Sequence, residues 1–259
     1  MKPRNDLSLL MALGFMGACI AYFLGYFFSH SKGEKHMETS VQSTGEQSVA
    51  SRLLLACGAI APLLNMVVIL ILGAIRPGYN AWIVPDSNLE LGDGGWIQIT
   101  NYIVTGALLL AFAIGMRLLL RTGRGSTWGP ILLGNYGLTF IGIGIFVTDP
   151  ALGYPPGASS ALTIHGAIHI LFGLLQFTSL IAACFVLARR DAALEGRGWF
   201  WYSGATGLLV AASYVAFVLT AKLLDGGPTG LIERIGIIGG GIWIALLAIR
   251  LMRKKVSIA

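Results

Sequence analysis

The sequence predicts an all-α fold, a polytopic bundle of transmembrane helices with seven spans. Hydrophobic residues make up 55% of its 259 residues and charged residues only 12%, about half of the roughly 25% that is usual in soluble domains. The mean hydropathy is +0.75. Crossing a bilayer takes roughly 20 apolar residues, and seven stretches meet that length, at 7–28, 52–75, 97–120, 128–147, 161–187, 198–221 and 230–251.

The first of these stretches is predicted to be an element added to a six-helix core. It is long, and no small-x-small cleavage site follows it, so we expect a retained helix rather than a signal peptide. Residues 29–50 are polar and rich in Ser, Thr and Glu, which favours a flexible linker. The predicted organisation is an N-terminal transmembrane helix at 1–28, a linker at 29–50 and a transmembrane core at 51–259. The first helix would suit docking to a membrane protein partner.

The charged residues divide between the two ends of the predicted bundle. One set of loops and the C-terminus carry the basic residues, and the opposite loops carry the acids Asp86, Glu90, Asp93 and Asp149. Because positive loops favour the cytoplasmic side, we predict a multi-pass protein of the cell membrane with its C-terminus in the cytoplasm. Seven spans then place the N-terminus outside, and Lys2 and Arg4 argue against that. The net charge of +6 is scattered in small groups, which excludes a nucleic-acid partner.

Polar side chains gather at the predicted outer ends of the helices. Asp149 ends the fourth span, two histidines begin the fifth, and an acid and a base begin the seventh. Polar groups facing lipid would lack hydrogen-bond partners, so these stripes are expected to face one another around a polar cavity open to the outside. The candidate residues are Asn101, Asp149, His165, His169, Gln176, Glu233 and Arg234.

The pair of histidines on the fifth span raises the question of a metal. His165 and His169 are four residues apart, which places them on one helical face, about 6 Å apart along the axis. That spacing can hold one zinc ion with Asp149 completing the shell, and zinc-bound water permits hydrolysis at neutral pH. No third histidine is nearby. The alternative, which we favour, is a hydrogen-bonded polar core in which Asp149 orients the histidines.

Three classes of function fit these residues. The first is a membrane enzyme, hydrolase-like and metal- or acid/base-assisted, acting on a lipid or isoprenoid. In that case Asp149, His165, His169 and Glu233 would be catalytic, and Asn101, Gln176 and Arg234 would bind the substrate. Arg234 suits an anionic headgroup, because guanidinium pairs well with phosphate and carboxylate. The second class is a proton-coupled transporter, disfavoured because paired repeats and broken helices are lacking. The third is an accessory or binding subunit of a membrane complex.

The order of several short motifs resembles a known family. "RPGY" and "GDGGW" follow one span, "GIGIFVTDP" ends another, a histidine-bearing helix comes next, and "GLIERIG" opens the last. This order resembles an uncharacterised bacterial and archaeal family of multi-helix membrane proteins, over about residues 50–251. The resemblance implies a six-helix core and no known activity. The His-x-x-x-His spacing is also similar to that of ceramidase-like and progestin-receptor-like hydrolases, which implies zinc, but here the third histidine is missing.

Overall fold

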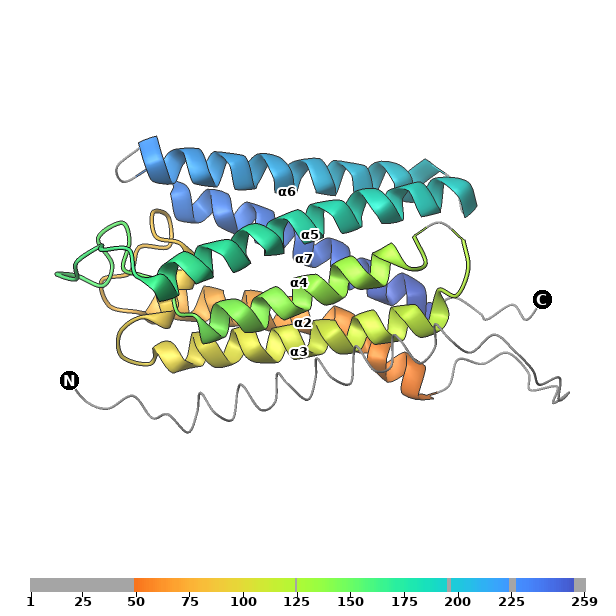
Figure 1. Cartoon of the computed structure of the whole chain (residues 1–259), viewed down its shortest axis with the longest axis horizontal. Helices are drawn as coiled ribbons and strands as arrows, with labels where there is room; N and C mark the ends of the chain where they lie inside the picture. Colours follow the sequence, from red (N-terminus) through yellow and green to blue (C-terminus); the bar gives the residue numbers. More distant parts are fainter. Residues whose placement is uncertain (1–48, 124, 195–196, 224–226, 254–259) are drawn as a thin grey trace, which may run out of the picture.

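The computed structural model describes residues 49–123, 125–194, 197–223 and 227–253. Six long helices run side by side (Figure 1), and a short 3-10 helix, η1, comes between the first two in the sequence. The elements are α2 (Val49–Ile75), η1 (Asp86–Glu90), α3 (Gly95–Leu119), α4 (Trp128–Ile145), α5 (Ile164–Leu194), α6 (Arg197–Leu223) and α7 (Thr229–Arg253). All six long helices are apolar enough and long enough to cross a membrane.

The predicted all-α bundle is therefore confirmed. Each predicted core span has its helix, and the ends differ by a few residues. The largest difference is at α5, which runs to Leu194 instead of residue 187, because the arginine pair at 189–190 continues the helix rather than ending it. The chain is already helical at Val49, within the predicted linker. The predicted span at 7–28 and the rest of that linker lie outside the described residues.

The six helices form a closed ring. Each packs against its neighbours in the sequence, and α7 closes the ring against α2. Large side chains fill the interior, among them Phe112, Leu180 and Trp243, all of which are fully buried. The indole Nε1 of Trp243 donates a hydrogen bond of 3.0 Å to the Ser203 hydroxyl, which ties α7 to α6 in the basic half of the bundle.

Glycines set the spacing between α3 and α4. A Cβ atom at Gly106 would lie 2.5 Å from the Gly137 carbonyl oxygen, and one at Gly137 would lie 2.8 Å from the Gly106 carbonyl oxygen. Small residues at such crossings let helix backbones approach closely in a membrane, where the hydrophobic effect does not drive helices together. As a result α4 is the most enclosed of the six helices, whereas α6 is the least enclosed.

The two ends of the bundle differ in charge. We call the end that carries Asp86, Glu90, Asp93 and Asp149 the acidic end; α3, α5 and α7 begin there. The opposite, basic end carries Arg117, Arg121, Arg189, Arg190, Arg250 and Arg253. At the acidic end the connection between α2 and α3 bends over the ends of the helices, with η1 in its middle (Figure 1).

Candidate functional site

A cavity of about 590 Å³ occupies the acidic half of the bundle. All six long helices contribute to its walls, α5 and α6 the most, and η1 covers it, with Asp86 and Asn88 among the lining residues. The cavity combines a polar side, where Glu233 and His169 lie, with an apolar and aromatic side that includes Phe177. A volume of this size is within the range of small-molecule sites.

The cavity does not continue toward the basic end. At Asn65, Phe140 and Ile237 it meets a second, small pocket of about 20 Å³. Beyond them the interior is filled by Leu180, Val210 and Trp243, each of which is at most 1% exposed. Within the described bundle the cavity is therefore a blind pocket, open only in its acidic half.

Two carboxyl groups meet on the polar wall. The Asp86 backbone N–H donates a hydrogen bond of 2.8 Å to Glu233 Oε2, and the charges of the two side chains interact. Both residues are buried, and both line the cavity. Two adjacent carboxyl groups of this kind are able to share one proton and so to act as an acid and a base.

Arg234 holds the loop that carries Asp86. Its Nη1 lies 2.8 Å from the carbonyl oxygens of Ala81 and Gly230 and 3.1 Å from that of Val84. Its Nη2 donates to the Tyr79 hydroxyl. The guanidinium is thus committed to the protein itself, and Arg234 is not among the residues that line the cavity.

Tyr79 completes this anchor. Its hydroxyl lies 3.0 Å from the Val84 carbonyl oxygen and 2.9 Å from that of Pro85. Burial raises the pKa of the Tyr79 phenol above its ordinary value of 10, and the neighbouring Arg234 charge opposes this only in part. The phenol therefore stays neutral at physiological pH and keeps the hydrogen that it donates to the loop.

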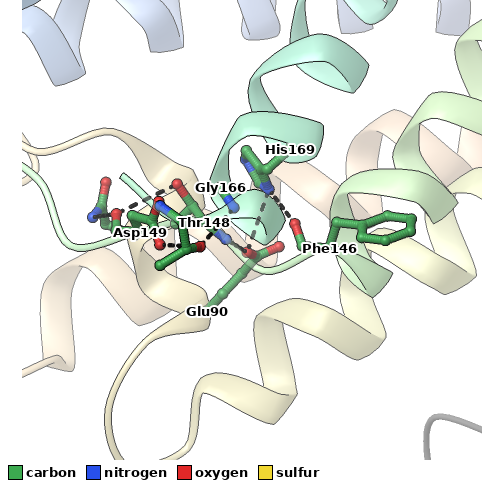
Figure 2. Close-up of polar contacts among 8 residues, drawn as sticks. Glu90, Phe146, Thr148, Asp149, Gly166 and His169 are labelled. Carbon is green, nitrogen blue, oxygen red and sulfur yellow. Dashed lines mark hydrogen bonds and ion pairs between the residues drawn. The ribbon is translucent and has the colours of Figure 1, made fainter. Parts of the chain in front are cut away.

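Glu90 and His169 lock a second part of the same loop (Figure 2). The Thr148 backbone N–H donates a hydrogen bond of 3.0 Å to Glu90 Oε2, and the same oxygen lies 3.7 Å from His169 Nδ1. His169 Nδ1 is also 2.8 Å from the Phe146 carbonyl oxygen. Because a carbonyl oxygen only accepts, Nδ1 carries the hydrogen. His169 therefore joins the end of α4 to α5 and to η1.

Asp149 caps the start of α5 (Figure 2). Its Oδ2 accepts a hydrogen bond of 2.7 Å from the Thr163 backbone N–H, and its Oδ1 accepts one of 2.8 Å from the Thr163 hydroxyl. Gly166 makes the approach possible, because a Cβ atom there would lie 1.9 Å from Asp149 Oδ2. A carboxylate is favourable at a helix N-terminus, so the geometry of Asp149 is that of a cap.

The two amide residues predicted to bind the substrate, Gln176 and Asn101, lie in different places. Gln176 lines the cavity. Asn101 does not line the cavity but lies in a polar cluster between α2 and α3, where its Nδ2 donates to Asn65 Oδ1 at 2.8 Å and to Gln98 Oε1 at 3.3 Å. Asn65, in turn, lines the cavity floor. Asn101 therefore supports the floor through a neighbour.

The predicted zinc ligands do not converge. His165 is exposed, lies outside the cavity lining and packs its ring against Phe146 at 5.6 Å. Both oxygens of Asp149 are engaged by Thr163. In the described ranges no group of three or more His, Cys, Asp or Glu side chains is placed to hold a metal ion. These three groups therefore do not fit a zinc site, and the catalytic roles of Asp149, His165, His169 and Glu233 stay predictions.

Two important residues were absent from the predicted site. The sequence places Asp86 and Glu90 among the acids of the outer loops and predicts no role for them in the site. In the structure both are buried, at 3% and 4% exposure. The signal that could have found them is the turn-rich loop itself, which places Tyr79, Asp86 and Glu90 within twelve residues and has its only arginine at its start, Arg76.

Sequence comparison assigns the chain to a family. The model of a family described as "Protein of unknown function (DUF998)" matches residues 59–250, which covers α3, α4, α5 and α6 completely and most of α2 and α7. The chain belongs to the DUF998 family. This confirms the resemblance to an uncharacterised multi-helix membrane family and, together with the six membrane-spanning helices, identifies the protein as an integral, multi-pass membrane protein.

One curated protein is similar over a shorter stretch. The "Fluoride-specific ion channel FluC" of Xanthomonas euvesicatoria pv. vesicatoria (strain 85-10) is 37% identical over 98 residues, which cover 37% of this chain and 71% of the channel. No solved structure matches the DUF998 chain significantly. The comparisons thus supply a family and one channel with partial similarity.

The anchor formed by Arg234 yields a first prediction. In Arg234→Lys the charge is retained, but a compact ammonium cannot reach the Tyr79 hydroxyl and three carbonyl oxygens together. Loss of buried, charge-assisted hydrogen bonds costs about 2–4 kcal/mol, so the Tm of the detergent-solubilised protein should fall by several degrees. Arg253→Lys, at an exposed position of the basic end, is the matched control and should leave Tm unchanged. Equal Tm values for the two variants would contradict the assigned role.

Proposed function

We propose that this DUF998 protein binds an amphipathic membrane molecule, a lipid or an isoprenoid, with the polar part of the ligand in the cavity and its chain between α5 and α6. The observation that carries the proposal is an apolar opening in the cavity wall. We place this opening between α5 and α6, because Ile170 and Leu174 of α5 line the cavity and yet are 60% and 43% exposed.

The facing rim of this opening belongs to α6. Phe217, Val218 and Ala221 line the cavity from that side, and Figure 1 shows α5 and α6 diverging toward the acidic end. An opening bordered by apolar side chains within the membrane admits a hydrocarbon chain at little cost, whereas a water-soluble ligand would leave that surface in contact with lipid. By the positive-inside rule, we assign the cavity to the outer leaflet and the basic end to the cytoplasm.

Blocking the opening tests this proposal. Leu174→Trp should fill the gap between α5 and α6 and remove most of the lipid that the wild-type protein retains through purification, as measured by native mass spectrometry. Leu208→Trp is the matched control, since Leu208 is exposed on α6 but does not line the cavity. The same retained lipid in wild type and in both variants would refute a ligand site at this opening.

The carboxyl pair extends the proposal to hydrolysis of the bound molecule. The Asp86–Glu233 pair is the acid–base element that the cavity wall offers. In such a step the ionised carboxylate takes a proton from water while the water oxygen forms a bond to the phosphorus of the headgroup phosphoester. The protonated partner gives its proton to the leaving oxygen as the ester bond breaks. Atoms and charges balance, with water as the only co-reactant.

The hydrolysis step is tested separately from binding. Glu233→Gln keeps the shape of the side chain and an acceptor for the Asp86 N–H but removes the titrating group. Release of water-soluble headgroups from a total lipid extract, in proteoliposomes, should fall about 100-fold or more, while lipid retention persists. Wild-type protein that retains lipid but releases no headgroup would establish a binding protein without this activity.

Ion conduction is the second candidate, because the partial similarity to FluC favours it. Conduction needs a path through the bundle, and the buried Leu180, Val210 and Trp243 close the cavity toward the basic end. We therefore expect fluoride efflux from proteoliposomes, followed with a fluoride-selective electrode, to equal that of empty liposomes. Protein-dependent efflux that Leu174→Trp reduces would replace lipid binding with conduction as the function of this cavity.

A further inference from the structure

The inner end of the cavity is walled by aromatic rings. Five aromatic residues from four helices line it: Tyr102, Phe140, Phe177, Tyr214 and Phe217. The ring of Tyr214 is stacked between its neighbours, at 4.5 Å and 24° from Phe177 and at 6.3 Å and 29° from Phe217. Aromatic faces carry negative electrostatic potential and attract organic cations.

The charged side chains that line the cavity also favour a cation over an anion. Three carboxyl groups contribute, from Asp86, Asp149 and Glu233. Lys222 is the one basic side chain in the lining apart from the titratable His169, and it is exposed at the mouth. Arg234 stands behind the carboxyl pair, with its guanidinium directed to the Ala81 and Gly230 carbonyl oxygens. The interior of the cavity therefore offers an anion no cation to pair with.

The Asp86 carboxylate has acceptor positions to spare. Among the hydrogen bonds of the described residues, the Asp86 backbone N–H donates to Glu233, and none is donated to the Asp86 side-chain oxygens; the Arg234 charge acts on them from behind the pair. The residue is only 3% exposed, and it lines the cavity. A carboxylate offers about four acceptor sites, and a nearly buried one is costly without donors or an opposite charge. Asp86 thus lacks a cationic or donor partner on its cavity side.

We infer that the bound amphiphile carries an organic cation, an amine or a quaternary ammonium group, which sits between the Asp86–Glu233 pair and the aromatic wall. This inference rests on the proposed lipid-binding function and specifies the headgroup. A phosphate on the same headgroup would lie toward the mouth, where Lys222 is exposed. A metal ion does not suit this wall, because hard cations require several oxygen ligands and aromatic rings supply none.

A headgroup series with constant acyl chains tests the inference. Phosphatidylcholine, phosphatidylethanolamine, phosphatidylglycerol and diacylglycerol are added at equal amounts to delipidated wild-type protein in detergent, and binding is quantified by native mass spectrometry. The two lipids that carry an ammonium group should bind about tenfold more tightly than the other two, as expected for a desolvated cation facing carboxylates and aromatic rings.

Two variants identify the residues responsible. Asp86→Asn with Glu233→Gln should abolish the preference for ammonium headgroups and leave binding of phosphatidylglycerol and diacylglycerol unchanged. Phe217→Leu keeps an apolar wall but removes a cavity-lining ring that Tyr214 covers on one face, so the preference should fall about threefold. Trp201→Leu is the matched control, because Trp201 is an exposed aromatic residue of α6 outside the lining.

The outcomes separate the headgroup from the proposed function. If phosphatidylglycerol binds wild-type protein as tightly as phosphatidylcholine, the inference of a cationic headgroup is overturned while lipid binding stands. If no lipid binds wild-type protein more tightly than it binds Leu174→Trp, both fail. If the preference survives the double carboxyl substitution in a protein whose Tm is unchanged, the assignment to Asp86 and Glu233 is overturned.

Discussion

A guanidinium buried under a loop organises the acidic end of this bundle. Irregular backbone inside a membrane protein needs partners for its carbonyl oxygens, because neither a helix ladder nor bulk water supplies donors there. Arg234 and Tyr79 provide these donors for Ala81, Val84 and Pro85. The loop can therefore fold inward over the helix ends. Without that anchor, Asp86 would have no fixed place beside Glu233, and the cavity would lose its polar wall.

Side chains also satisfy backbone groups at the other connection of the acidic end, between α4 and α5. Asp149 satisfies the start of α5, and His169 satisfies a carbonyl group at the end of α4. Glu90 of η1 contacts both helix ends: it accepts a hydrogen bond from the Thr148 N–H after α4, and it lies close to His169 of α5. The polar residues of the acidic end divide into two groups. One group closes backbone hydrogen bonds at the rim, and the other, chiefly Asp86, Glu233 and Gln176, faces the space inside.

The sequence predicted the helices, but it did not predict which polar residues bond to backbone groups and which face the cavity. Hydropathy depends on the mean composition of about 20 residues, so it located every described span and missed only ends, as at α5. Proximity at the acidic end was also predictable, because topology alone brings Asp149, His169 and Glu233 to one side. The hydrogen-bond partner of each group was not predictable from the sequence. Whether Asp149 met Thr163 or a ligand depended on the missing Cβ atom of Gly166, and whether Asp86 was solvated or buried depended on Arg234, 148 positions away.

The uneven attachment of α6 has a mechanical consequence. This helix is the least enclosed of the six. It is fixed by the hydrogen bond between Ser203 and Trp243, and its far part spans the cavity wall up to Lys222. The distance from Ser203 to Lys222 is about 29 Å at 1.5 Å per residue. A tilt of about 5° around the Ser203–Trp243 contact would shift the Lys222 end of α6 by about 2.5 Å, which would change the width of the gap between α5 and α6 while the buried Trp243 stays in place.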